Sequence, residues 1–256
     1  MTVLQLVLGA LSGGLVGFVL GLFGGGGSIL ATPLMVYLVG AAPHVALGTS
    51  ALAVAANAAS GLIQHARKGT VRWRCGAMFA AAGMLGAFGG STLGKSIDGQ
   101  KLLFLFAIVM IVVGALMLRG RKGEGVDTTD CDASNAPKVL GAGMVTGAFS
   151  GFFGIGGGFL IVPGLTMSAR MPMINAVGTS LVAVTAFGLT TAANYAVSGL
   201  VDWALAGIFV VGGVLGGVFG TQLASKLSGG GKLKPAFAGL IFVVAAYMLY
   251  ESGTSL

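Results

Sequence analysis

The stretch Leu22-Phe23-Gly24-Gly25-Gly26-Gly27-Ser28-Ile29-Leu30-Ala31-Thr32-Pro33 decides the fold of this chain. It lies inside a long apolar run, where an uninterrupted helix would be the ordinary expectation. Each glycine in a helix interior costs about 1 kcal/mol relative to alanine, and a proline costs about 3 kcal/mol. Four consecutive glycines followed by Pro33 therefore predict a broken helix.

The same element returns 130 positions later as Phe152-Phe153-Gly154-Ile155-Gly156-Gly157-Gly158-Phe159-Leu160-Ile161-Val162-Pro163. The register then holds without a gap on either side of the break. Matching positions include Gly13, Gly17 and Gly21 with Gly143, Gly147 and Gly151, and Gly48-Thr49-Ser50 with Gly178-Thr179-Ser180. The pattern predicts two homologous halves, at residues 1–118 and 138–256, joined by a polar linker at 119–137.

Composition places the chain in a membrane. It has 256 residues, of which 55% are hydrophobic and only 8% charged, whereas soluble domains carry about 25% charged residues. We therefore expect an all-α polytopic protein of the cell (inner) membrane, with the N-terminus forming a first span rather than a removed signal. The net charge of +7 does not indicate nucleic acid, because the basic residues lie between apolar runs. Apolar runs that predict helices lie at 3–23, 28–40, 45–63, 75–93, 102–118, 139–153, 159–167, 174–195, 204–223 and 236–250.

Loop charge suggests how the two halves are related. The segment 65–74 is rich in Arg and Lys, whereas its counterpart at 195–204 has none and contains Asp202. Basic loops are typically cytoplasmic, so corresponding loops are expected on opposite sides. The halves are then inverted repeats, as in many secondary transporters. A parallel duplication stays open, and so does the choice between three and five crossings in each half.

The two breaks are candidate substrate sites. An unwound segment exposes backbone N–H groups, and the half-helix that follows points its positive end at an anion. The candidate residues are Gly24, Gly25, Gly26, Gly27 and Ser28 in the first half, and Gly154, Gly156, Gly157 and Gly158 in the second. The alternative is that these glycines only allow close helix packing.

Polar residues that follow each break are further candidates. Thr49, Ser50, Thr179 and Ser180 lie where a helix is expected to open, so their hydroxyls either cap the helix or donate to the anion. Asn57 and Asn194 lie deep in the apolar runs. For such amides, a helix–helix hydrogen bond is the competing interpretation.

The remaining motifs argue for a site without fixed charge. All seven acidic residues lie in loops, in the linker or near the C-terminus, so no intramembrane carboxylate site is expected. We expect no metal and no cofactor: His44 and His65 have no acidic or Cys partner and are expected in loops or at the interface. Cys75 and Cys131 form no CxxC or metal spacing, and no function is assigned to them. The stretch 89–96 matches a P-loop pattern but closes an apolar run instead of following a strand.

The doubled glycine signature and the two Gly-Thr-Ser triplets resemble the sulfite exporter TauE/SafE family over almost the whole chain. The resemblance implies a secondary transporter of small sulfur-containing or organic anions, of the sulfite, thiosulfate and sulfonate class, with alternating access between two halves. Proton coupling is an open hypothesis. An anion channel with the same site is the alternative, and an enzyme is not expected. The second copy departs from the first at Ile155, where the first has Gly25. Substrate, direction and oligomeric state are not specified by the sequence.

Overall fold

The computed structural model describes residues 3–119, 131, 135–154, 158–169, 171–227 and 233–254. Within these residues the chain is helical, and no strand is present. The first half contains α1 (Val3–Phe23), η1 (Gly24–Gly27), α2 (Ser28–Pro33), η2 (Leu34–Leu38), α3 (Pro43–Arg67), α4 (Trp73–Gly94) and α5 (Gly99–Arg119). The second half contains α6 (Ala136–Phe152), α7 (Gly158–Ser168), α8 (Met173–Val197), α9 (Trp203–Leu227) and α10 (Leu233–Thr254). The expectation of an all-α polytopic membrane protein is confirmed.

The described helices are suited to a lipid environment. Five of them are long and apolar enough to cross a membrane: α1, α3, α4, α8 and α9. Large hydrophobic side chains cover their outer surface, for example Leu85, which is 70% exposed, and Phe219, which is 66% exposed. In water such a surface would be costly at about 25 cal/mol per Å², and in lipid it carries no such cost.

Helices from the two halves interlock rather than forming separate bundles. α1 packs along α9, and the corresponding helix α6 packs along α4. Glycines make both contacts possible: a Cβ on Gly17 would overlap the backbone of Gly213, and one on Gly147 would overlap Gly83. The glycine spacing seen in the sequence therefore also serves close packing, which is the alternative interpretation for the glycines of α1 and α6.

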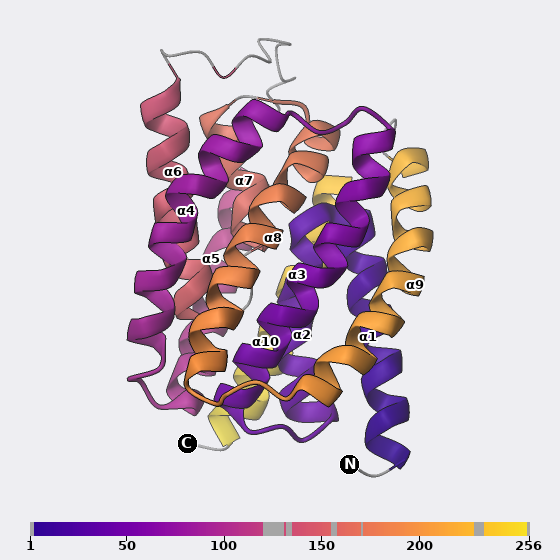
Figure 1. Cartoon of the computed structure of the whole chain (residues 1–256), viewed down its shortest axis with the longest axis vertical. Coiled ribbons are helices and arrows are strands. Elements are labelled where there is room, and N and C mark those ends of the chain that lie inside the picture. Colours follow the sequence, from indigo (N-terminus) through magenta and orange to yellow (C-terminus); the bar gives the residue numbers. More distant parts are fainter. Residues whose placement is uncertain are drawn as a thin grey trace.

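The central pair, α3 and α8, occupies equivalent positions in the two halves and runs antiparallel. Gly48 lies against Tyr195, Gly188 lies against Ala51, and Gly61 lies against Leu181. Equivalent helices that run in opposite directions are the arrangement that inverted halves produce. Both termini lie at the lower end of the molecule in Figure 1.

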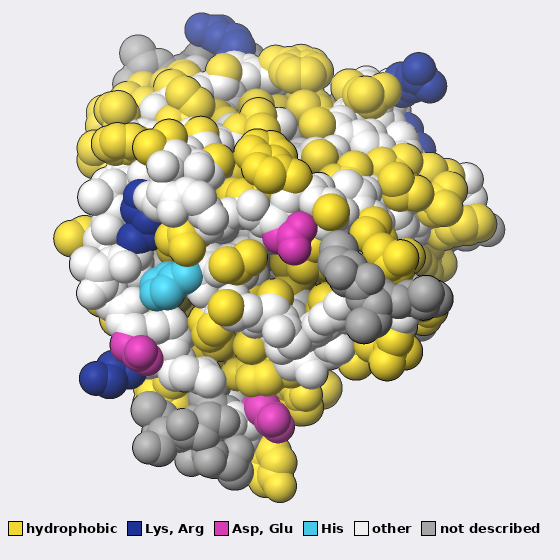
Figure 2. Space-filling model, turned by 60° about the horizontal axis from the view of Figure 1, so that its bottom comes forward, with side chains coloured by type: hydrophobic (Ala, Val, Ile, Leu, Met, Phe, Trp, Pro, Cys, Tyr) yellow, Lys and Arg dark blue, Asp and Glu magenta, His cyan; other side chains and the backbone are white. Residues whose placement is uncertain are grey.

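We name the two ends of the bundle for use below. The termini face carries both termini and the α4–α5 and α8–α9 connections (Figure 1). The basic face is the opposite end, with the α3–α4 connection and the starts of α6 and α8. Figure 2 turns the termini face toward the reader: hydrophobic side chains dominate this view, and charged side chains are few and scattered.

Candidate functional site

The first break is built as the sequence predicts. α1 ends at Phe23, and the four glycines form a short 3₁₀ turn before helix resumes at Ser28. Gly24 has φ +65°, a conformation that costs other residues about 1–2 kcal/mol. The returning helical segment, Ser28–Leu38, ends as a π-helix after Pro33, because proline removes one backbone donor from the helix.

The second break repeats this geometry. α6 ends at Phe152, and Gly154 has φ +63°, matching Gly24 at the equivalent position. The predicted site residues Gly156 and Gly157 lie outside the described residues. Helix resumes at Gly158 and continues to Ser168 as α7, so both returning segments are 11 residues long.

The two returning helices meet at their first residues. The Gly158 N–H donates to Ser28 Oγ at 3.1 Å, and this contact is buried. Ser28 and Gly158 occupy equivalent positions in the sequence repeat, since they lie 130 residues apart. The contact therefore brings the start of α2, which follows η1 directly, against the start of α7 in the interior of the protein. The N-terminal end of a helix carries a partial positive charge.

The serines of the two Gly-Thr-Ser triplets line the breaks. Ser50 Oγ lies 2.9 Å from Thr32 Oγ1 on α2 and 3.4 Å from Gly154 O. In the other half, Ser180 Oγ–H donates to Val177 O at 2.8 Å, and a Cβ on Gly24 would lie 2.8 Å from Ser180 Oγ. Each break therefore contacts the triplet of the opposite half. These hydroxyl groups are fully buried.

The threonines of the same triplets point elsewhere. Thr179 Oγ1 accepts the Arg72 N–H at 2.9 Å, and Thr49 Oγ1 accepts the Asp202 N–H at 2.9 Å. The first bond fastens the α3–α4 connection over α8 at the basic face, and the second fastens the α8–α9 connection over α3 at the termini face. We call them the basic-face latch and the termini-face latch. The expectation that the triplets open a helix is wrong, since α3 and α8 begin at Pro43 and Met173, about two turns earlier.

The two predicted amides lie in different environments. Asn57 is 3% exposed, and neither amide atom has a hydrogen-bond partner among the described residues. Its amide occupies the space that a Cβ on Gly213 would need. Asn194 instead belongs to a network at the termini face, where Lys95 Nζ donates to its Oδ1 at 2.8 Å and its Nδ2 donates to Ser91 Oγ at 2.6 Å.

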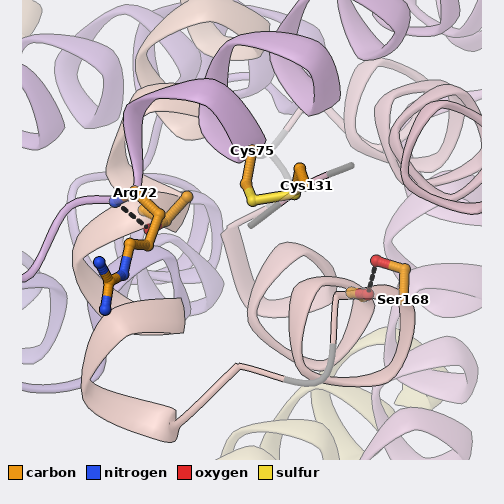
Figure 3. The surroundings of a disulfide bond; sticks show 6 residues. Arg72, Cys75, Cys131 and Ser168 are labelled. Atoms are coloured by element: carbon orange, nitrogen blue, oxygen red, sulfur yellow. Dashed lines mark hydrogen bonds between the residues drawn. A yellow bond between two sulfur atoms is a disulfide. The ribbon is translucent and has the colours of Figure 1, made fainter. Parts of the chain in front are cut away.

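Two features were not expected from the sequence. Cys75 and Cys131 form a disulfide, although neither was given a role (Figure 3). Their separation of 56 residues gives no motif from which the pairing could have been predicted. His65 was expected in a loop or at the interface, but it lies in the last turn of α3, is 1% exposed, and has Nδ1 2.9 Å from Thr70 Oγ1.

A pocket on the outer surface does not coincide with this centre. It has a volume of about 430 Å³ and is lined by Ala10, Trp203, Ala204, Gly207, Ile208 and Val211. This lining comes from α1 and α9 and offers apolar side chains, so it lacks the donors that a polar solute needs. Among the described residues, no group of three or more His, Cys, Asp or Glu side chains is placed to hold a metal ion.

The fold and the paired breaks define the class of this protein: a multi-pass α-helical membrane protein of two similar halves, with interrupted helices meeting at its centre. The chain belongs to the sulfite exporter TauE/SafE family, whose family model, described as "Sulfite exporter TauE/SafE", matches residues 9–248. The resemblance found in the sequence is thereby confirmed, and the chain is a membrane transporter of this family.

Relatives across bacteria cover the chain almost end to end. A "Probable membrane transporter protein" of Xylella fastidiosa (strain 9a5c) is 53% identical over 259 residues, which span 100% of this chain and 99% of the relative. "Probable membrane transporter protein YdhB" of Bacillus subtilis (strain 168) is 28% identical over 240 residues, which span 90% and 96% of the two chains. No solved structure matches this chain.

Proposed function

We propose that this protein is a secondary transporter of small sulfur-containing or organic anions, of the sulfite, thiosulfate and sulfonate class. One observation carries the proposal: the N-termini of α2 and α7 meet at the buried Gly158 N–H···Ser28 Oγ contact. The substrate class comes from the family, and the site comes from this contact.

Electrostatics favours an anion at this position. Two helix N-termini that face each other carry partial charges of the same sign in a buried region, and a bound anion would turn this repulsion into attraction. Hydrogen bonds to a charged group contribute about 1.5–3 kcal/mol each. Backbone N–H groups of Ser28 and Gly158, with hydroxyl groups of Ser28, Ser50 and Ser180, supply enough donors to offset a desolvation cost of several kcal/mol.

The polar groups at this centre are buried, as alternating access requires of a transporter between its two open states. The hydroxyl groups of Ser28, Thr32, Ser50 and Ser180 are fully buried. The basic-face latch and the termini-face latch are both formed. Binding an anion requires these groups to exchange partners and one latch to open. We propose that the halves are inverted repeats and that the latches open alternately.

Transport in liposomes tests the proposal. Purified protein should move radiolabelled sulfite with a rate that saturates, and unlabelled sulfite on the opposite side should accelerate it. Thiosulfate and a small alkyl sulfonate should compete. A flux that never saturates and shows no such acceleration would instead favour the channel with the same site.

Two matched variants test the site. Ser28→Ala removes one donor, and the loss of about 1.5–3 kcal/mol should weaken sulfite affinity about 10- to 150-fold. Ser12→Ala is the control, because Ser12 is 2% exposed and its Oγ has no partner among the described residues. Gly26→Leu should abolish flux. Unchanged transport in both Ser28→Ala and Gly26→Leu would reject the site.

Proton coupling is tested separately. We propose that the proton travels with the substrate, since sulfite is partly protonated near neutral pH and no carboxylate lies in the described apolar helices away from their ends. A pH step across the vesicle should then change the accumulation ratio. A ratio that does not respond to the step would exclude this coupling.

A further inference from the structure

The disulfide joins the linker between the halves to the first turn of α4. Cys75 and Cys131 have Cα atoms 5.4 Å apart, and they are 2% and 4% exposed. Cys75 is the third residue of α4, which begins at Trp73. Figure 3 shows the bond beside Arg72, whose N–H makes the basic-face latch.

The same turn of α4 packs directly on α8. A Cβ on Gly76 would lie 3.2 Å from Thr179 Cγ2 and 3.3 Å from Val182, and the Gly76 N–H donates to Arg72 O at 2.9 Å. The disulfide, the first turn of α4 and the latch bond therefore form one connected unit. Cys75 therefore lies within one helical turn of the Arg72–Thr179 contact.

Charge indicates that this unit faces the cytoplasm. Four basic residues lie in the α3–α4 connection or at the helix ends beside it, next to the disulfide: Arg67, Lys68, Arg72 and Arg74. Among the described residues, Lys95 and Lys101 are the basic residues at the termini face, where they are accompanied by Asp98, Asp202 and Glu251. Cytoplasmic connections carry the excess of Lys and Arg, so the basic face is the cytoplasmic one.

A permanent disulfide is not expected on the cytoplasmic side of a membrane. Glutathione and thioredoxin keep cytosolic thiols reduced, and the disulfides found there are usually transient, catalytic or redox-sensing. We propose that Cys75 and Cys131 form a reversible redox clasp that controls the basic-face latch, and hence access to the central site; this control of access rests on the proposed transport function.

The chemistry is ordinary thiol–disulfide exchange. Two glutathione thiols, or one cytosolic dithiol, reduce the bond in two steps through a mixed disulfide, giving two cysteine thiols and one oxidised glutathione or dithiol. Glutathione disulfide reverses the reaction under oxidising conditions. In the oxidised state the bond to Cys131 holds the first turn of α4 and the latch stays closed, whereas in the reduced state the latch opens more readily.

The thiol state in cells gives the first test, which does not depend on transport. Intact cells are quenched with acid, and free thiols are alkylated with a maleimide carrying a polyethylene glycol mass tag. Two tags are expected in growing cells, and none after brief treatment with a thiol oxidant such as diamide. A chain that is fully disulfide-bonded in untreated cells would overturn the clasp and assign the bond a permanent structural role.

Hydrogen exchange gives the second test, again without any substrate. Amides of residues 69–76 in the purified protein should exchange faster after reduction, whereas those of the α8–α9 connection, 198–202, should not change. Cys131→Ser should match the reduced protein and lose its response to reductant, and Cys75→Ser should agree. Equal exchange in the oxidised and reduced protein would overturn control of the latch.

Flux measurements complete the design. In liposomes, reduction should raise the rate of sulfite movement in the wild-type protein and leave Cys131→Ser unchanged. A protein that moves no anion in either state refutes the proposed function, while the thiol and exchange measurements still decide the clasp. Flux that responds to reductant equally in Cys131→Ser would overturn the role of this cysteine pair.

Discussion

Replacing the buried amide of Asn57 by leucine should stabilise the protein and impair transport at the same time. Leucine has the same branching as asparagine, with methyl groups where the amide carries oxygen and nitrogen. Asn57 is 3% exposed, and both amide atoms lack partners among the described residues. A buried polar group without a partner costs about 1–3 kcal/mol. The substitution removes that cost and should raise the free energy of unfolding by a similar amount.

The expected shift in melting temperature is measurable. For chains of 150–250 residues, 1 kcal/mol corresponds to about 2–4 °C, so Asn57→Leu should raise Tm by several degrees. Tryptophan fluorescence of the purified protein in detergent can follow unfolding, because Trp73 and Trp203 lie at the starts of α4 and α9. Sulfite transport should fall, because Asn57 lies two turns after Ser50 on the same face of α3. Its amide also has a donor and an acceptor that form no hydrogen bond within the described residues.

Asn194→Leu is the matched control. Its amide donates to Ser91 Oγ at 2.6 Å and accepts from Lys95 Nζ at 2.8 Å, so this substitution removes one hydrogen bond from each of these two groups and should lower Tm. If Asn57→Leu lowers Tm as much as Asn194→Leu, then the Asn57 amide is paired in the native protein and the reasoning is wrong. A raised Tm with unchanged transport would remove Asn57 from the site.

Three further outcomes are expected. Gly24→Ala should fold poorly or not at all, because φ +65° disfavours a side chain and the added Cβ would lie 2.7 Å from Val177 O. The yield of monodisperse protein measures this, and a normal yield with normal flux would contradict it. Thr179→Val leaves the Arg72 N–H without its acceptor, at a cost of about 1–3 kcal/mol, and should speed hydrogen exchange at Arg72 but not at the termini-face latch. Lys95→Met removes three hydrogen bonds to the end of α8 and should lower Tm while leaving the affinity for sulfite unchanged; weaker sulfite binding would place Lys95 in the site.

The sequence predicts most of the fold because the decisive features are local. Four glycines and a proline within one apolar run disrupt a helix whatever surrounds them, and the breaks at Gly24–Gly27 and after Phe152 lie where the pattern predicts them. Helix ends were predicted less well. Apolar content alone predicts a helix from residue 45, whereas α3 begins at Pro43, because proline is well suited to the first turn of a helix.

The arrangement of the site depends on contacts that no local pattern encodes. Ser28 and Thr49 are both hydroxyl residues of the first half, yet one meets Gly158 at the centre and the other fastens the α8–α9 connection. The difference arises because α3 packs on α8 with a particular register, and that register is set by glycines such as Gly48 and Gly188. The disulfide is likewise a consequence of topology, which brings Cys131 to the start of α4.

The most direct test of the central claim is to locate a bound anion. Selenite has the charge and shape of sulfite, and its selenium can be located by anomalous X-ray scattering from crystals of the protein. The account predicts a selenium peak within hydrogen-bonding reach of Ser28 Oγ and the Gly158 N–H, lost in Ser28→Ala and retained in Ser12→Ala. A peak confined to the basic loops, or none at a selenite concentration that blocks sulfite transport, would contradict it.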